Sequence, residues 1–380
     1  EGSNFSVLID PLAYNTYITA FNTNMAVNES FLDSATVRRN VVSLASNIGY
    51  LPRSRKASKA TISFSISPNN DSSLTNVVLQ PGVVCTGSVS DTSYIFSTIE
   101  PITGIINEST VSFNSIDIYQ GTFLTKTFTF DASINQRFVL ENSFIDTETI
   151  KVYIKRSGDT GDGTEYKQID NIIDVDKDSR VYFVREIDDQ KYELRFGDGI
   201  FGKKLGTESG DDGNIITVKY LVTDGEDGND VSQFSFAGTI KDESDILTFD
   251  SPTLTIDSTK SQNGADIEPL DSIRYFAPLS YSSQNRAVTA KDYESIIKRI
   301  YPDTESLSVV GGEEMDPPQY GNVLISIKPR GGNYISDFNK NQILSKLRQY
   351  SVSGINQKIV DLKLLFIELE SSVYYTDSFV

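Results

Sequence analysis

The chain has 380 residues and a mass of 42.1 kDa, which is too long for one compact core and predicts two or three domains. It carries 34 basic and 52 acidic residues, and the formal net charge of −18 argues against nucleic-acid binding as its main role. There is no histidine and only one cysteine, Cys85, so histidine-based catalysis, internal disulfides and cysteine-cluster metal sites are excluded.

Two amphipathic helices are predicted in residues 1–56, the N-terminal helical segment. Asp10 is expected to cap the first helix, with Pro11 in its first turn. Asp33 is expected to cap the second, and Gly49 is placed to end it. A hairpin of two helices cannot bury both apolar stripes, so either the rest of the chain or another chain covers them. The stripes are the candidate interface: Tyr14, Ile18, Phe21 and Met25 on the first helix, and Val37, Val41 and Leu44 on the second.

Residues 57–262 change to a period of two, which predicts a mainly antiparallel β region. In residues 61–67 apolar and polar side chains alternate strictly, and short runs of the same kind recur as far as residue 220. Turn sequences such as Pro81-Gly82 and Asp224-Gly225 separate the runs. The region is expected to form one domain, or two sub-domains split near residues 131–146.

Helices return in residues 263–380, which are predicted to form an α+β layer domain that associates with other copies. Thr289 and Asp292 form a capping-box pattern at the start of one helix, and Ser336 opens another. Strands are expected at 307–310, 322–328 and 358–369. The order α-β-β-α-β suggests helices on one face of a small, mostly antiparallel sheet. The predicted class of the whole chain is therefore multidomain α+β.

Charges are unevenly distributed, and a short basic stretch lies between the helices and the β region. It consists of Arg53, Arg55, Lys56 and Lys59. One interpretation is a solvated surface, and the other is electrostatic pairing with neighbouring subunits.

A glycine-rich segment, Gly197 to Gly202, matches G-x-G-x-x-G and is followed by Lys203. A phosphate-binding loop needs a strand before it and a helix after it, so that the phosphate meets the helix N-terminus. A strand precedes the segment, but the residues after Lys203 do not predict a helix. The alternative, a tight β-turn whose glycines adopt positive φ, is favoured.

Two acidic patterns are candidates for metal or catalytic sites. Asp174, Asp176 and Asp178 copy the first ligands of a calcium loop, but Ser179 and Arg185 stand where the required Gly and Glu would be. The carboxylates of Glu313-Glu314 lack the aromatic platform expected of a glycosidase. No catalytic, metal-binding or cofactor-binding residue is predicted. The longest apolar runs are also far too short for a membrane span, which needs ~20 residues.

The last third of the chain contains the most specific motif, R-A-V-T-x-x-D-Y, from Arg286 to Tyr293. Together with the Gly197–Gly202 turn and the pair Gly311-Gly312, it resembles the baseplate J-like family of contractile-tail phages, and within it the large wedge proteins of T-even-type phages. The similarity runs from about residue 30 to the end. Such proteins extend beyond both ends of this chain, which begins with Glu1, so the chain is expected to be an excerpt of a longer one.

This resemblance implies a structural, non-enzymatic subunit of the virion tail baseplate, assembled in the host cytoplasm. Such proteins form the inner ring around the central spike hub, stay linked while the baseplate changes shape, and take part in triggering sheath contraction. Their N-terminal helices join a helical core bundle with other wedge proteins, and their C-terminal regions pair with a neighbouring copy. Hub and sheath-initiator proteins are further candidate partners.

The resemblance also carries structural roles onto individual residues. Arg286 is expected to clamp the loop before the 289–300 helix through an ion pair or a carbonyl contact, and Tyr293 to pack in the core. Gly197, Gly199 and Gly202 shape the turn, and Gly311 and Gly312 shape a loop. Two alternatives to the structural subunit are a carbohydrate-binding tail protein with exposed aromatic residues on its strands, and a nucleotide-dependent enzyme using the glycine-rich turn.

Overall fold

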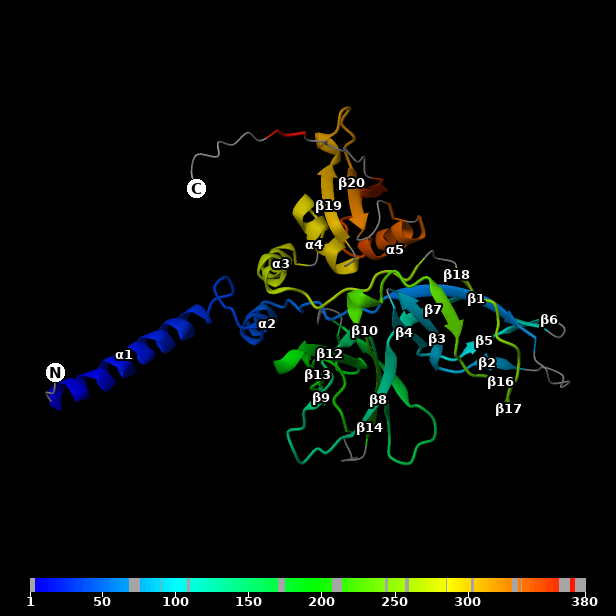
Figure 1. The fold of residues 1–380 in the computed structure, drawn as a ribbon, viewed down its shortest axis with the longest axis horizontal. Coiled ribbons are helices and arrows are strands. Elements are labelled where there is room, and N and C mark those ends of the chain that lie inside the picture. The colour runs from blue at the N-terminus through cyan, green and yellow to red at the C-terminus, as the bar shows by residue number, and fades with distance from the viewer. Residues whose placement is uncertain are drawn as a thin grey trace. The chain divides into compact units, whose positions relative to one another are not determined.

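The computed structural model describes residues 4–67, 76–89, 91–107, 110–169, 175–206, 214–242, 245–256, 260–284, 286–301, 304–329, 334–335, 337–361 and 370–372 (Figure 1). The chain divides into two units, Glu1–Asn285 and Arg286–Val380. The helix α3 (Leu270–Ser283) belongs to the first unit, where its Ile273 and Ala277 pack against α2 (Arg38–Asn47) and the loop before it.

Two N-terminal helices precede the β region, as predicted, but their starts differ. The first, α1 (Asn4–Asn28), begins before Asp10 and continues through Pro11, which removes one backbone hydrogen bond without ending the helix. The second, α2 (Arg38–Asn47), begins after Val37 rather than at Asp33. It ends as predicted at Gly49, whose φ of +80° allows the amide of Tyr50 to reach the carbonyl of Ala45.

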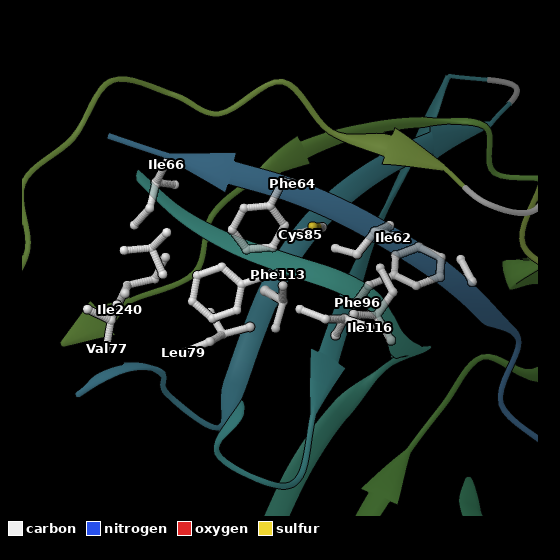
Figure 2. Packing of buried hydrophobic residues seen from close by; sticks show 14 of the residues in the cluster. Ile62, Phe64, Ile66, Val77, Leu79, Cys85, Phe96, Phe113, Ile116 and Ile240 are labelled. Carbon is white, nitrogen blue, oxygen red and sulfur yellow. The ribbon is translucent and has the colours of Figure 1, made fainter. Parts of the chain in front are cut away.

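The first β core combines two sheets. In the seven-stranded sheet the order is β15-β3-β4-β7-β1-β18, with β6 beside β7, and in the four-stranded sheet it is β17-β16-β2-β5. Alternation in β1 buries Ile62, Phe64 and Ile66, and the ring of Phe64 stacks on Phe113 with centroids 4.9 Å apart (Figure 2). The strands are β1 (Lys59–Ile66), β2 (Val77–Leu79), β3 (Gly82–Val89), β4 (Thr92–Thr98), β5 (Ile102–Thr103), β6 (Ile105–Asn107), β7 (Thr110–Gln120), β15 (Gln233–Phe236), β16 (Ile240–Asp242), β17 (Asp245–Ile246) and β18 (Thr255–Ile256).

A second β core is built on another seven-stranded sheet, ordered β8-β14-β10-β11-β12-β13-β9. The chain enters it at Gly121, earlier than the expected break at 131–146. A Cβ at Gly121, just before β8, would lie 2.1 Å from the carbonyl oxygen of Val222, the last residue of β14. Only glycine therefore fits at this position. The strands are β8 (Thr122–Thr129), β9 (Phe138–Leu140), β10 (Ile145–Lys155), β11 (Thr164–Gln168), β12 (Val181–Glu186), β13 (Tyr192–Phe196) and β14 (Ile215–Val222).

The second unit has the predicted order α-β-β-α-β, in α4 (Ala290–Ile300), β19 (Thr304–Gly311), β20 (Asn322–Pro329), α5 (Asp337–Leu347) and β21 (Asn356–Val360). Thr289 and Asp292 form the predicted capping box of α4. The sheet is mixed, because β19 and β20 are antiparallel whereas β20 and β21 are parallel. Ser336 and residues 362–369 of the expected last strand lie outside the described residues.

Candidate assembly surface

The helix α1 presents an apolar surface that the described part of the chain leaves exposed. Tyr14 is 68% exposed, Phe21 58% and Met25 39%, while Ile18 is half-buried. Asp10 is the one charged residue between Asn4 and Asn28, in a chain of which 23% is charged. A helix surrounded by water usually carries charges on its outer face, so this composition is typical of a helix covered in an assembly.

The spacing of the predicted stripe on α1 is that of a coiled-coil seam. Tyr14, Ile18, Phe21 and Met25 follow one another at intervals of four, three and four residues. We call these four residues the Tyr14 stripe.

The corresponding residues of α2 are placed differently, because the chain itself covers Val41 fully and Leu44 in part. Val41 is fully buried and Leu44 partly buried in a cluster with Ile273 and Ala277 of α3. The sequence could not show this, because α3 lies more than two hundred residues away. Val37, which is 43% exposed, is the member of this set that stays accessible.

Polar contacts fix α2 to the β region. The guanidinium of Arg38 donates to both carboxylate oxygens of Glu186 and to the carbonyl of Glu268. The carboxylate of Glu268 is itself buried, and accepts hydrogen bonds from the Tyr50 hydroxyl at 2.8 Å and the Arg53 amide at 3.0 Å. Because buried carboxylates are costly unless paired, these contacts define one position for α2.

The corner between α1 and α2 is closed by Glu29. Its carboxylate accepts from the side chain of Asn40 at 2.7 Å, from the amide and hydroxyl of Thr36, and from the amide of Val37. The hydrogen bond from Asn40, followed by those from Thr36, lowers the pKa of Glu29 to about 2. Glu29 therefore holds the turn that precedes α2, whereas the N-cap residue of α2, Val37, has no side-chain capping bond and the cap expected from Asp33 is not formed.

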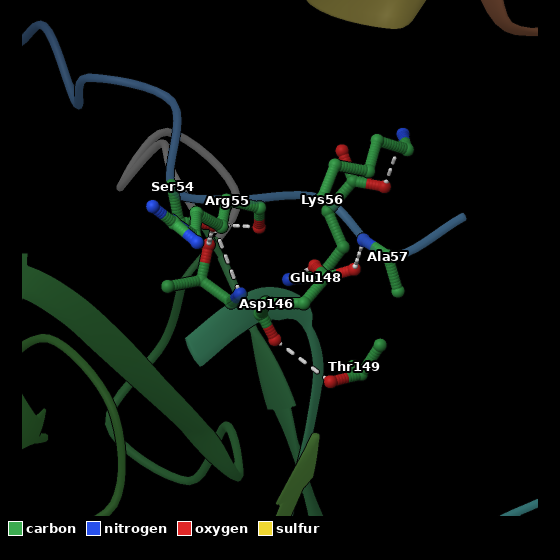
Figure 3. Close-up of polar contacts among 8 residues, drawn as sticks. Ser54, Arg55, Lys56, Ala57, Asp146, Glu148 and Thr149 are labelled. Carbon is green, nitrogen blue, oxygen red and sulfur yellow. Dashed lines mark hydrogen bonds and ion pairs between the residues drawn. The ribbon is translucent and has the colours of Figure 1, made fainter. Parts of the chain in front are cut away.

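The linker after α2 is tied to the start of β10 (Figure 3). The buried carboxylate of Asp146 accepts from the amide of Ala57 at 2.8 Å and from that of Glu148 at 3.0 Å. Burial, and then the charge of Glu148, raises the pKa of Asp146 to about 6, against the opposing effect of Lys56.

The basic stretch pairs within the chain rather than with a neighbour. Lys56 meets Glu148 at 2.8 Å, Lys59 meets Asp117 at 2.7 Å and Arg55 lies 3.8 Å from Asp266. Arg53 donates to the carbonyl of Asp266. The interpretation as an electrostatic contact to other subunits is therefore not supported by its geometry.

The glycine-rich segment is a tight turn. Gly199 and Gly202 have φ of +93° and +86°, and a Cβ at Gly197 would lie 2.1 Å from the carbonyl carbon of Gly202. The carboxylate of Asp198 accepts from the amides of Ile200 and Phe201, both at 2.8 Å. These amides cannot also hold a phosphate. Lys204 then forms a β-bridge with Gly197 where a phosphate site would need a helix, so the nucleotide hypothesis fails.

The other chemical hypotheses find no support. Among the described residues no group of acidic or cysteine side chains could hold a metal, and Asp174 lies outside them. The carboxylate of Asp176 accepts from Ser179 in a turn. Of the described aromatic residues at 60–250, only Phe144 and Phe201 are strongly exposed, and neither lies in a strand, contrary to the carbohydrate-binding prediction. None of the described helices is long and apolar enough to cross a bilayer.

The family-motif residues of the second unit differ in their burial and contacts. Tyr293 is fully buried in the core, which agrees with its expected packing role. Gly312 has no room for a side chain, since a Cβ would lie 1.8 Å from the carbonyl oxygen of Gln319, and a Cβ at Gly311 would meet the carboxylate of Glu313. Arg286 is exposed, and its side chain has no partner among the described residues, so the expected clamp is absent there.

Sequence reasoning missed a second set of exposed apolar residues on α1. Phe5 is 74% exposed, Ile9 56% and Leu12 64%. Their spacing of four and three residues is a helical signal, and it precedes the start that Asp10 and Pro11 suggested. Placing the helix start at Asp10 hid this set.

Comparisons with known proteins agree with an assembly role. Residues 1–50 match the family described as "Baseplate wedge protein gp6-like, helical domain", and residues 289–360 match "Baseplate structural protein gp6, C-terminal domain I". The chain is 27% identical over 394 aligned residues to baseplate wedge protein gp6 of Enterobacteria phage T4. The alignment covers 99% of this chain and 57% of that protein, so the chain spans little more than half the length of this relative.

A weaker similarity connects the chain to a cryo-EM structure of the anti-feeding prophage baseplate, with a TM-score of 0.31 and 10% identity over 91% of this chain and 66% of that one. That similarity is too low to support a fold assignment. The sequence matches show that parts of the chain are similar to gp6-like baseplate wedge and baseplate structural proteins. These relatives are structural proteins, which is consistent with a non-enzymatic chain. The broader resemblance to the baseplate J-like family stays a prediction.

Proposed function

We propose that the chain is the part of a baseplate wedge subunit that joins wedges into the inner ring around the central spike hub. Its first unit offers α1 to a helical bundle shared with other wedge proteins, and its second unit associates with a neighbouring copy. Such a subunit would assemble in the host cytoplasm and keep the ring connected while sheath contraction is triggered. The single observation that carries the proposal is the exposed, nearly uncharged helix α1.

The way α1 is attached supports this role. The helix α2 is held by the contacts of Arg38 with Glu186 and Glu268. Its apolar side is covered by α3, and Glu29 fixes the turn that connects it to α1. The helix is therefore presented from a fixed base while its own apolar residues stay uncovered. Obligate interfaces resemble a protein core cut in half, and the Tyr14 stripe has that composition.

The second unit supports association in a less specific way. Tyr320 is 80% exposed and Tyr334 64%, and Val288 and Val352 are also strongly exposed. Large aromatic residues at the surface are enriched in protein interfaces. Contacts to hub or sheath-initiator proteins rest on the family resemblance alone.

The decisive experiment substitutes Phe21→Asp in the gene carried by the assembling phage. Burying a phenylalanine contributes up to about 3 kcal/mol, and a buried carboxylate adds a further cost, so assembled baseplates counted by electron microscopy should fall more than tenfold. Asn15→Asp adds the same charge to an exposed position beside the stripe and should leave the count near that of the unchanged phage. Normal baseplate numbers with Phe21→Asp would overturn the proposal.

A further inference from the structure

The turn from Gly197 to Gly202 carries two large apolar side chains at its tip. Ile200 is 70% exposed and Phe201 is 49% exposed. Turns at the surface usually carry glycine, proline and short polar residues, so two adjacent large apolar side chains are unusual at this position. Single exposed apolar residues need no explanation, but adjacent large ones are typical of a surface that another molecule covers. We call Ile200 and Phe201 the apolar tip.

The backbone holds the apolar tip in one conformation. The amide of Gly199 donates to the carbonyl of Gly202 at 3.0 Å, and the carboxylate of Asp198 accepts from the amides of both tip residues. A Cβ at Gly202 would lie 2.8 Å from Cγ2 of Val181, so the turn also packs closely against the start of β12. Because the turn is already ordered, little conformational entropy is lost when a partner covers the tip.

A second turn lies beside the first and is fixed to it. The amide of Gly202 donates to the carbonyl of Asp176 at 2.9 Å, and the amide of Lys203 donates to that of Ser179 at 2.7 Å. The carboxylate of Asp176 accepts from the hydroxyl of Ser179 and from the amide of Asp178, so it stabilises its own turn. The two turns therefore form one surface that carries the apolar tip.

This surface has a surplus of unpaired positive charge. The two turns and the residues directly after them carry four exposed basic residues, which we call the basic rim: Lys177, Arg180, Lys203 and Lys204. Within the described part of the chain no side chain of the basic rim forms an ion pair. Basic residues elsewhere are paired, such as Lys56 with Glu148 and Lys59 with Asp117. In a chain with a net charge of −18, the basic rim is a local exception.

The charge and shape of the surface indicate which partner it fits. Two copies of the same surface cannot pair, because that contact would set one basic rim against another. An anionic membrane would attract the basic rim, but it would repel the rest of a chain with a net charge of −18. A protein pocket that is apolar inside and bordered by aspartate and glutamate matches both the tip and the rim.

We propose that the apolar tip inserts into an apolar pocket on a different protein of the baseplate, and that acidic residues at the edge of this pocket pair with the basic rim. The contact rests on the proposed baseplate role, but it does not use α1 or the Tyr14 stripe. It connects the second β core to the assembly at a point other than the helical bundle.

Photo-cross-linking in the assembled phage tests the contact. The substitution Phe201→benzoylphenylalanine is introduced into the chain that the phage encodes, and purified baseplates are irradiated. We expect a covalent product that joins this chain to a different protein, at an apolar residue with Asp or Glu nearby. The control is Ile246→benzoylphenylalanine in β17, where Ile246 is 60% exposed, and it should not give this product. A link to another copy of this chain, a link to lipid, or no link would overturn the inference.

Charge reversal tests the basic rim. Lys203→Glu combined with Lys204→Glu replaces two attractive pairs by repulsion, so the yield of the cross-link per baseplate should fall by about tenfold. Lys203→Arg combined with Lys204→Arg keeps both charges and should preserve the yield. A yield that both glutamate substitutions leave unchanged would contradict an acidic edge of the pocket.

The contact of the apolar tip and the bundle of α1 can fail separately. Normal baseplate numbers with Phe21→Asp would overturn the bundle and leave the cross-link from position 201 in place. Loss of baseplates with Phe21→Asp, together with no cross-link from position 201 in otherwise unchanged baseplates, would overturn the contact of the apolar tip alone.

Discussion

Arg38 forms a two-pronged contact with Glu186, with Nε 2.8 Å from Oε1 and Nη2 3.0 Å from Oε2. The glutamate side chain is 2% exposed, and among the described residues Arg38 is the cation that pairs with its charge. The contact joins the first turn of α2 to β12 and thereby sets the base from which α1 extends. Fixing the helix base in this way reduces the conformational entropy that assembly must remove.

Removing Arg38 should destabilise the α2 region strongly. Arg38→Ala leaves the buried carboxylate of Glu186 unpaired, at a cost of about 3–5 kcal/mol. The measurement is hydrogen exchange of the α2 amides, which should lose most of their protection. Arg39→Ala is the control, because its pair with Asp188 is largely exposed and contributes at most about 1 kcal/mol. Equal loss of amide protection with the two substitutions would contradict the conclusion that the pair of Arg38 and Glu186 holds α2 in place.

Asp146 should make stability depend on pH. Its pKa rises from an ordinary 3.8 to about 6 on folding, so the native state takes up a proton between these values. The free energy of unfolding should therefore fall as pH rises from about 4 to 6, by up to about 3 kcal/mol, and stay level above that window.

The check is to compare denaturant unfolding of the unchanged chain with that of Asp146→Asn across this range. The difference between their free energies of unfolding should be independent of pH above about 6 and should change steeply between about pH 4 and 6. Glu148→Gln removes the second-largest cause of the raised pKa and should move the window to lower pH. Parallel profiles for the unchanged chain and Asp146→Asn would show that the carboxyl is not perturbed.

Glu29 should control the corner between α1 and α2. Glu29→Gln removes the charge that accepts hydrogen bonds from Thr36, Val37 and Asn40, so the amides of Thr36 and Val37 should exchange faster with solvent. Because the pKa of Glu29 is lowered to about 2, the ionised contact is complete above its ordinary pKa of 4.5 and is lost as pH falls toward 2. Asp33→Asn is the control and should leave both amides protected.

Gly312→Ala should disrupt the second unit. The new Cβ would lie 1.8 Å from the backbone oxygen of Gln319, which cannot move without breaking the turn, so a cost above about 3 kcal/mol is expected. The loss of stability is measured by hydrogen exchange of the β19 and β20 amides in the full chain, which should become faster. For Gly311→Ala the nearest atoms to the new Cβ belong to the flexible carboxylate of Glu313, so this substitution should reduce the free energy of unfolding clearly less. A larger loss of stability with Gly311→Ala than with Gly312→Ala would show that the close approach of Gly312 to Gln319 is not what requires glycine.

Local signals in the sequence determined several elements correctly. Thr289 and Asp292 predicted the start of α4, Gly49 the end of α2, and the alternation around Phe64 a half-buried strand. Each of these depends on interactions between residues only a few positions apart, so the sequence carries the whole signal.

Contacts between distant segments decided the rest. Val41 reads as an interface residue until Ile273 and Ala277 cover it, and the switch between the two β cores at Gly121 is set by its approach to Val222. The pKa of Asp146 depends on burial beneath the linker at Ala57. The sequence by itself determined where helices and strands form and that α1 lacks charge. Only the tertiary structure decided which apolar faces stay uncovered, because covering a face requires a partner that no local pattern identifies.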